Sequence, residues 1–434
     1  MALFGMVGTG NWQNEARPES WRESLLYYWP NGMMPLTAMM SKIPSDPVKD
    51  PVHHWGVQAP PEQGGLLGDN PSYVYLDVDC QIPYQAGGQI GQPLYVSVPD
   101  AIADETREGH VVQLASTDYF LMTCNATVTG VIRVPGNSRI AIRLIEADDN
   151  GGAQTLADAD YFFIVGTAHE EGSPSPDPMA AEPEWYENFT EIWWNTFMLT
   201  GTAEETRTRY GSKEYQRLKK HCLMLHGIEM EKSCWFGVKR VEKGANNQDK
   251  RYAMGIFEFT RTHAGAVYLS DFRRDPAFAG KRWVDRDGGS LWLKQQIELA
   301  YRYGDNTRVG FSGSGALMGL ETMAEALGTI NLSTGAKEYG IEVTTLKTAN
   351  GAMPLKSHPL FSQHALLRNR IYFLGPKNVR FRPLGSRDTK FEKDPQFFDG
   401  KKEGYRTEGT FEFGNPKEFM VLEGVGCDSV LQAP

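Results

Sequence analysis

The sequence lacks the features that mark membrane, secreted and nucleic-acid-binding proteins. No apolar run is long enough to span a bilayer, and residues 1–8 show no basic stretch leading into an apolar core, so neither a membrane span nor a secretory signal is predicted. Five cysteines are scattered through 434 residues without a CxxC pair, which indicates reduced thiols in a cytosolic setting. A net charge of −10 argues against a surface built for a polyanion.

What the sequence does contain is the composition of a large globular protein, with 41% hydrophobic and 23% charged residues. A chain of 434 residues is too long for one ordinary core, so we expect two or three subdomains, one of them inserted into another. In a cytosolic setting the glycosylation sequons at Asn125, Asn188 and Asn331 are chance matches.

Residues 1–70 are rich in Gly, Pro, Met and Trp, and their short apolar clusters follow no regular period. This pattern predicts an extended arm without a core of its own. Its exposed Trp and Met side chains need a cover, and a neighbouring subunit is one natural cover. We therefore expect a chain lacking residues 1–60 still to fold, but to be unable to form closed assemblies.

Residues 72–178 predict a small β domain. Apolar residues alternate with polar ones from Val74 to Ile82, which indicates a strand. The block ends in Gly172–Pro178, a proline-rich stretch that predicts a stiff connector. Further strands are predicted at Leu94–Val98, His110–Ala115, Tyr119–Cys124, Thr127–Val134, Arg139–Ile145 and Tyr161–Val165.

A long helix is predicted next. Ser212 is a plausible N-cap, Gly237 a C-terminal stop, and the helix runs to about Phe236. One face carries the residues that we expect to be buried, at Tyr215, Leu218, Cys222, Leu225 and Ile228.

The rest of the chain mixes helices and strands, which predicts an α+β fold. Helices are expected at Gly289–Tyr303 and Gly315–Leu327, with a buried strand at Thr307–Phe311 between them. Other strands are predicted at Met254–Phe259, Ile341–Leu346, Arg370–Leu374, Val379–Pro383, Tyr405–Phe413 and Phe419–Glu423.

A search for catalytic motifs finds none that is complete. Gly310–Gly315 lies between a strand and a helix, but its spacing fits neither a nucleophile elbow, a Walker loop nor a GxGxxG turn, so helix-entry glycines with a Ser cap are the better interpretation. The run His169–Glu171 resembles the start of HExxH, yet Ser173 stands where the second His belongs.

Other clusters are interpreted as structural. Cys222, His226 and Cys234 share the long helix without a fourth ligand in register, and we expect them, like the pair His53–His54, to be buried structural residues. Asp285–Asp287 is a solvated face, and Trp193–Trp194 predicts a strand with one ring buried and the other at a subunit contact. We therefore predict no enzyme, and no catalytic, cofactor-binding or metal-ligating residue.

A series of collinear motifs resembles a known family. They are Gly166–Ser173, Pro183, Tyr186–Ile192, Leu199–Glu204, Glu214–Gln216, Lys219–Lys220, Gly255–Phe259, Tyr339–Val343, His358–Phe361, Phe381–Leu384, Arg387–Thr389, Asp399–Gly400, Thr407–Phe413 and Asn415–Lys417, with Pro35–Ala38 and His54–Trp55 in the arm. In order and spacing this set, which spans most of residues 35–425, is similar to the major capsid proteins of tailed phages.

The resemblance implies the Hong Kong 97-type shell fold. Its N-terminal arm would be residues 1–71, and its extended loop residues 72–195 with a β domain inserted at about 95–160. The peripheral domain would be 196–286 and 366–434, with a spine helix at about 212–236, and the axial domain 287–365.

The function implied is self-assembly as pentamers and hexamers into an icosahedral virion shell, built in the host cytoplasm. The expected partners are other copies of the chain, with portal, scaffold and decoration proteins as further candidates, and the shell would enclose double-stranded DNA without sequence-specific binding. Two alternatives remain open. One is an encapsulin-type compartment, and the other is a carbohydrate-binding β-domain protein that uses Trp193 and Trp194 as a sugar platform.

Overall fold

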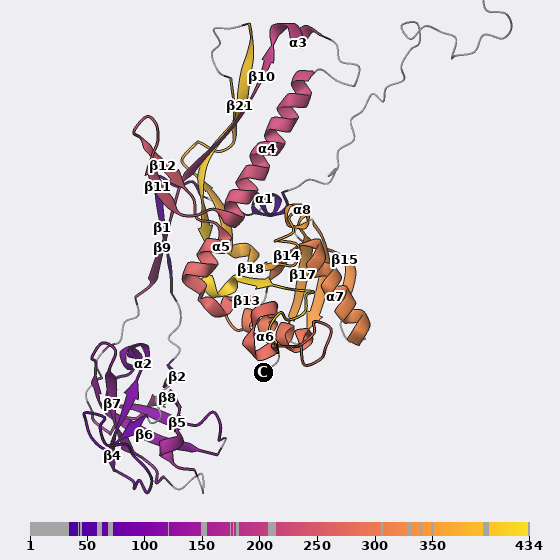
Figure 1. Cartoon of the computed structure of the whole chain (residues 1–434). Coiled ribbons are helices and arrows are strands. Elements are labelled where there is room, and N and C mark those ends of the chain that lie inside the picture. The colour runs from indigo at the N-terminus through magenta and orange to yellow at the C-terminus, as the bar shows by residue number, and fades with distance from the viewer. Residues whose placement is uncertain are drawn as a thin grey trace, which may run out of the picture. The chain divides into compact units, whose positions relative to one another are not determined.

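The computed structural model describes residues 34–41, 43, 46–58, 63–67, 73–119, 121–148, 154–173, 175, 176, 178, 182–206, 214–304, 307–327, 332–338, 341–348, 351–393 and 399–432. The chain forms two compact units, drawn in Figure 1. The β unit comprises residues 58–184, and the main unit comprises residues 1–57 and 185–434. Each unit is described by itself.

The β unit is an antiparallel sheet with the strand order β2-β8-β5-β6-β7-β4-β3. Alternate residues of its strands point into one core, as the burial along β5 illustrates. Helix α2 contacts both β2 at the sheet edge and β7 further in, so the sheet curls around its core. The elements are β2 Gly64–Leu66, β3 Val74–Tyr75, β4 Pro93–Val98, α2 Asp100–Glu105, β5 His110–Ala115, β6 Thr123–Ile132, β7 Ser138–Leu144 and β8 Tyr161–Thr167.

Most strands predicted for this unit are confirmed, but two predictions are wrong. The strand expected from Val74 to Ile82 stops at Tyr75, because the Asp77 carboxylate accepts hydrogen bonds from the N–H groups of Gln81 and Ile82 and folds the segment into a turn. The segment Tyr119–Cys124 is mostly the turn before β6, which begins only at Thr123. In both places an apolar pattern lies in a turn whose side chains are largely exposed.

The main unit contains two sheets, a long two-stranded ribbon of β1 and β9, and the hairpin β11-β12. Its elements in the first half are α1 Pro35–Met40, β1 Val52–Val57, β9 Glu184–Phe189, β10 Glu191–Thr200, α3 Gly201–Glu205, α4 Glu214–Phe236, β11 Arg240–Lys243, β12 Asp249–Tyr252, α5 Ile256–Phe259 and β13 Leu269–Asp271. Those in the second half are α6 Gly289–Tyr301, β14 Val309–Ser312, α7 Ser314–Leu327, β15 Leu332–Glu338, β16 Ile341–Thr348, β17 Gly351–Ser357, α8 Pro359–Gln363, β18 Ile371–Leu374, β19 Val379–Pro383, β20 Lys390–Lys393, β21 Gly400–Phe413 and β22 Met420–Glu423.

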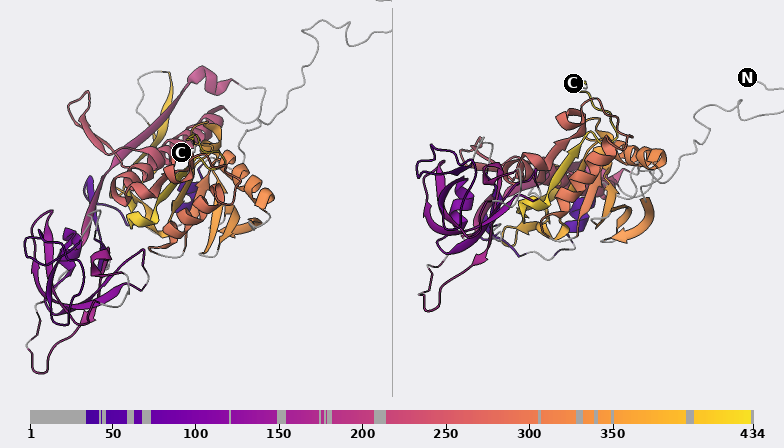
Figure 2. Two further views of the ribbon diagram at one scale, coloured as in Figure 1. Left: turned by 60° about the horizontal axis from the view of Figure 1, so that its bottom comes forward. Right: turned by 90° about the horizontal axis from the view of Figure 1, so that it is seen from below.

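The long helix α4 lies along the first sheet, which has the order β10-β21-β19 with β20 also paired to β21 (Figures 1 and 2). The predicted helix is confirmed at its C-terminal end, where the N–H of Gly237 bonds the carbonyl of Ser233; Ser212 lies outside the described residues. The predicted buried face is partly wrong. Cys222 is buried as expected, but the buried face continues at every fourth residue, through His226, Met230 and Cys234. Leu225, which we expected to be buried, is exposed.

The second sheet has the order β13-β22-β18-β14-β17-β16-β15 and is mixed parallel and antiparallel. Side chains of α6 and α7 form a core with one of its faces, and the C-terminal end of α4 forms a core with the other. Strands β14 and β18 are covered on both faces, so every one of their residues is buried. The predicted helices at 289–303 and 315–327, and the buried strand between them, are confirmed.

The described part of the arm does not fit the prediction that residues 1–60 can be removed without unfolding. Leu36, Met39 and Trp55 lie in the same core as α4 and β21. Val48 also bridges to Leu384, and β1 pairs with β9. For residues 34–57, the cover that we expected from a neighbouring subunit comes from the same chain.

The strand predicted at Met254–Phe259 is wrong: Ile256–Phe259 is the helical turn α5. The buried Asn188 side chain bonds both the N–H and the carbonyl of Met254, which leaves this residue no place in a strand ladder. Gly255 then packs so closely on the backbone at the end of α4 that a Cβ atom would lie 2.7 Å from the nitrogen of Gly237. Contacts distant in sequence thus override the local β pattern.

Candidate functional site

Cys222, His226 and Cys234, three residues that share α4, are all buried. The ring of His226 is buried, with one nitrogen 2.7 Å from Asn195 Oδ1 and the other 2.7 Å from Thr407 Oγ1, and burial lowers its pKa. Cys234 is fully buried, which raises the pKa of its thiol well above the usual value. Among the described residues no group of three His, Cys, Asp or Glu side chains is placed to hold a metal ion.

The glycines at Gly310–Gly315 are packing residues at the entry to α7, as predicted. A Cβ on Gly313 would lie 2.4 Å from the carbonyl oxygen of Arg368, and one on Gly310 would strike Leu355. The serine that bonds a helix N–H here is Ser362, whose hydroxyl accepts from the N–H of Ser314.

The pair His53–His54 is split by the alternation of β1. His53 is mostly buried, and its Nε2 lies 2.7 Å from Glu412 Oε2, whereas His54 is exposed, so the prediction of two buried histidines is wrong for the second. Arg382 also binds Glu412. Burial raises the pKa of Glu412, but the hydrogen bonds from His53 and Arg382 outweigh it and lower the pKa to about 2. The contact between His53 and Glu412 therefore joins β1 to β21.

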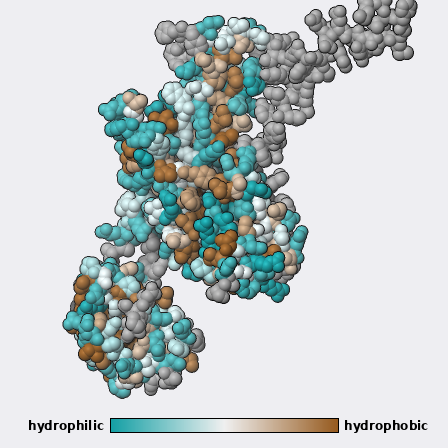
Figure 3. All heavy atoms as spheres, in the orientation of Figure 1, coloured by the Kyte–Doolittle hydropathy of each residue, from teal (hydrophilic) through white to brown (hydrophobic). Residues whose placement is uncertain are grey.

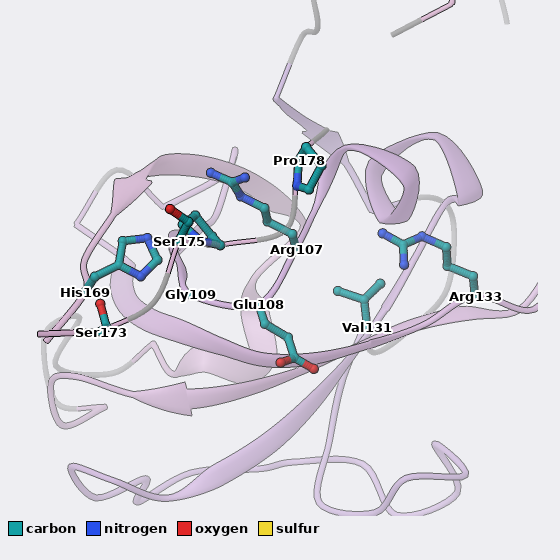
Figure 4. A pocket seen from close by; sticks show the side chains of 10 residues that line it. Arg107, Glu108, Gly109, Val131, Arg133, His169, Ser173, Ser175 and Pro178 are labelled. Carbon is teal, nitrogen blue, oxygen red and sulfur yellow. The ribbon is translucent and has the colours of Figure 1, made fainter. Parts of the chain in front are cut away.

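A polar hollow of about 650 Å³ lies in the β unit (Figure 4). Its lining includes Arg107, Glu108, Arg133 and His169, together with Ser173, Ser175, Pro176 and Pro178. In Figure 4 the guanidinium groups of Arg107 and Arg133 lie well apart. Arg107 bonds the buried His110, and the guanidinium of Arg133 lies beside Asp104 and Thr106.

The sheet face away from α4 presents an apolar strip. Residues 192, 194, 196 and 198 of β10 alternate with the residues that face the helix, and Ile192, Trp194 and Met198 are 53%, 57% and 61% exposed. Trp193 is buried, so the predicted strand with one buried ring is confirmed. The guanidinium carbon of Arg406 lies 5.4 Å from the centre of the Trp194 ring.

A second apolar surface is a groove of about 380 Å³ at the C-terminal end of α4. Its walls are Phe236, Phe257, Leu360, Leu366 and Leu367, and its rim carries Lys232, His364 and Arg370. Leu366 is 82% exposed. In Figure 3 apolar residues reach the surface along α4 and again near its C-terminal end.

Beside the groove lies a fully buried carboxylate. Glu231 accepts hydrogen bonds from the N–H groups of Leu36 and Thr37 at the start of α1, from the Thr37 hydroxyl, and from His358 Nε2 at 2.8 Å. Both Glu231 and His358 are inaccessible to solvent. This cluster, which we call the Glu231 clasp, ties the N-terminal segment to α4 and to the start of α8.

Comparison with known proteins identifies the family. The model of the SU10 major capsid protein family matches residues 7–426, nearly the whole chain. The chain belongs to this family. It is therefore a structural protein of the phage capsid and not an enzyme. Among the described residues, no helix of this capsid protein combines the length and the apolar character needed to cross a membrane.

Individual relatives are distant. The capsid protein is 24% identical over 253 residues to the major capsid protein of Pseudomonas phage PaMx41, and this match covers 58% of the chain and 59% of the relative. Similar solved structures include the holo-SrpI encapsulin complex from Synechococcus elongatus PCC 7942, at 8% identity and a TM-score of 0.38 over 64% of this chain and 80% of that one. Another is the cyanophage Pam1 capsid, at 10% identity and a TM-score of 0.37 over 60% of this chain and 83% of that one. At such TM-scores neither structure favours a phage shell over a compartment.

For a capsid protein the surfaces that meet other copies are the functional site. The resemblance in the sequence found the family but not these surfaces. The exposed side of β10 is visible in the alternation around Trp194, whereas the groove and the Glu231 clasp combine residues more than 100 positions apart. No sequence signal pairs such residues, because each is ordinary in its own segment.

Proposed function

We propose that this capsid protein self-assembles through pentamers and hexamers into the icosahedral head shell of a tailed phage, which encloses double-stranded DNA without reading its sequence. The observation that carries the proposal is the family match over residues 7–426. Portal, scaffold and decoration proteins are the further partners that such a shell would meet.

We further propose the Hong Kong 97-type arrangement of domains. The arm would be residues 1–71, the extended loop 72–195 with an inserted β domain at about 95–160, the peripheral domain 196–286 and 366–434, and the axial domain 287–365. The helix α4 lying along the sheet of β10 and β21 supports a spine helix in the peripheral domain. The β unit, whose core runs from Leu67 to Phe162, supports an insertion with somewhat wider bounds.

Assembly would cover the apolar strip on β10. Three large apolar side chains on one open sheet face resemble the centre of a protein interface more than an ordinary surface. Contacts between unlike patches then close into rings, and many modest contacts together hold the shell.

The direct test is the size of the purified full-length chain, by size-exclusion chromatography and negative-stain electron microscopy. We expect pentamers, hexamers or closed particles, and a compact monomer at micromolar concentration would contradict the proposal. In hydroxyl-radical footprinting, Trp194 and Met198 should be modified several-fold more slowly in particles than in the monomer. Equal rates would exclude the strip on β10 from the contacts.

The rival functions are separated by other observations. Neighbouring genes for portal and terminase favour a phage head, and a neighbouring gene for a cargo enzyme favours a compartment. A sugar platform made of both tryptophans is disfavoured because Trp193 is buried under α4 and the ring of Phe411. If the isolated monomer binds a glycan and Trp194→Ala abolishes this binding, the carbohydrate-binding function is favoured instead.

A further inference from the structure

We infer that the groove at the end of α4 receives Trp185 of a second copy of this chain. The inference rests on the proposed function, since it names one contact through which copies would assemble. It is carried by three observations: an apolar groove with a cationic rim, an exposed tryptophan preceded by acidic residues, and the packing of that tryptophan against Gly56 of β1.

The groove is shaped for one large apolar side chain. Leu360 at its base is buried, while Phe236 and Leu366 stand open to solvent at its sides. Its volume of about 380 Å³ has room for an indole ring. Phe236 packs edge-on against Phe361, at 6.0 Å between ring centres, so this wall belongs to the core of the main unit.

The rim of the groove is cationic. Lys232 is exposed on α4, and Arg370 lines the same groove and shares Glu423 with Arg273. His364 adds a third basic side chain. None of the described residues that line the groove is acidic, so its occupant should carry acidic groups beside an apolar anchor.

Trp185 is such an anchor. It is 70% exposed, the largest exposed fraction of any tryptophan among the described residues, and Glu182 and Glu184 precede it closely in the chain. The ring lies against Gly56 of β1, where an added Cβ would stand 3.4 Å from it. One side of the indole is thus supported while the rest is open, and little side-chain entropy remains to be lost on docking.

The two surfaces are different patches of the same chain. A contact between unlike patches is heterologous, and repeated around an axis it closes into a ring, which a capsid subunit requires. A buried tryptophan in a pocket with charged residues around it is also the composition of an interface hot spot.

The test is a cross-link between two preparations of the full-length chain. One carries Trp185→Cys and the other Leu366→Cys; they are mixed as dissociated subunits, reassembled and oxidised. We expect a dimer band in the mixture, with a disulfide between positions 185 and 366 identified by mass spectrometry. Each variant alone controls for the native cysteines, and Met318→Cys, at a position on α7 that is 61% exposed, replaces Leu366→Cys as a control outside the groove.

Two further variants test the energetics. Trp185→Ala should raise the protein concentration needed for assembly at least about tenfold. Lys232→Glu should weaken assembly too, and Glu182→Lys combined with Glu184→Lys should restore part of the loss. If Trp185→Ala assembles normally and the mixed cysteine variants form no disulfide between positions 185 and 366, the inference is overturned and the shell proposal still stands. A wild-type chain that forms no particles overturns the shell proposal itself.

Discussion

The Glu231 clasp predicts a large loss of stability from a nearly isosteric change, Glu231→Gln. The carboxylate accepts four hydrogen bonds in a site closed to solvent, two at each oxygen. An amide keeps only one acceptor oxygen, so its NH₂ group must face the N–H groups of Leu36 and His358, or else the N–H of Thr37 beside a hydroxyl that has to turn round to accept. Each hydrogen bond to a charged group contributes about 1.5–3 kcal/mol, so the free energy of unfolding should fall by about 3–5 kcal/mol.

The assay is urea unfolding of the unassembled chain, followed by tryptophan fluorescence. All ten tryptophans lie outside residues 58–184, so the signal reports on the main unit without a contribution from the β unit. The protein concentration must stay below that of assembly, because assembly would add apparent stability.

The matched control is Glu229→Gln on the same helix. Glu229 is exposed and accepts one hydrogen bond, from Asn195 at 2.8 Å, so its loss should change the free energy of unfolding by about 0.5 kcal/mol or less. If Glu231→Gln is no more destabilising than Glu229→Gln, the clasp does not hold the N-terminal segment in place and the reasoning is refuted.

Three other predictions follow from buried or close contacts. Because the pKa of Glu412 is lowered, its ionised form stabilises the fold above pH 4.5, and this stabilisation is lost as the pH falls toward 2. The free energy of unfolding should fall by about 2 kcal/mol over this range, after allowance for the partial exposure of Glu412. A Glu412→Gln chain should lack this part of the dependence of stability on pH. Gly319→Ala should lower the free energy of unfolding by about 2 kcal/mol although alanine favours helices, because the added Cβ would lie 2.3 Å from a backbone carbon. Gly227→Ala is the control, since its Cβ would meet only a movable methionine side chain, and it should be less destabilising when both variants are compared by thermal melting. Arg308→Met leaves the buried carboxylate of Glu418 without its ion pair and should cost about 3–5 kcal/mol in urea unfolding, whereas a loss below about 1 kcal/mol would show that the pair contributes little.

Elements with a strong local pattern were predictable. The helices α6 and α7, the fully buried strand β14 between them, and the long helix α4 with its glycine stop all follow from residues within one segment. The same holds for the alternation around Trp193 and Trp194, which placed one ring inside and one outside.

Predictions failed where a distant residue decided the local structure. Asn188 takes both backbone groups of Met254 and so prevents the strand expected there. Turn formation at Asp77 outweighs the alternating pattern from Val74 to Ile82. The buried face of α4 was misjudged at Leu225 because the helix meets β10 and β21, whose positions no helical pattern contains.

The sequence by itself determined the family, through collinear motifs, and the α+β class, through the periods of its helices and strands. Only the tertiary structure decided which arm residues are core, how Glu231 holds them, and where apolar surface remains for a partner. The physical reason is that periodicity records which side of an element is apolar, whereas burial depends on what packs against that side. In this capsid protein that partner is often more than 100 residues away, as His358 is from Glu231.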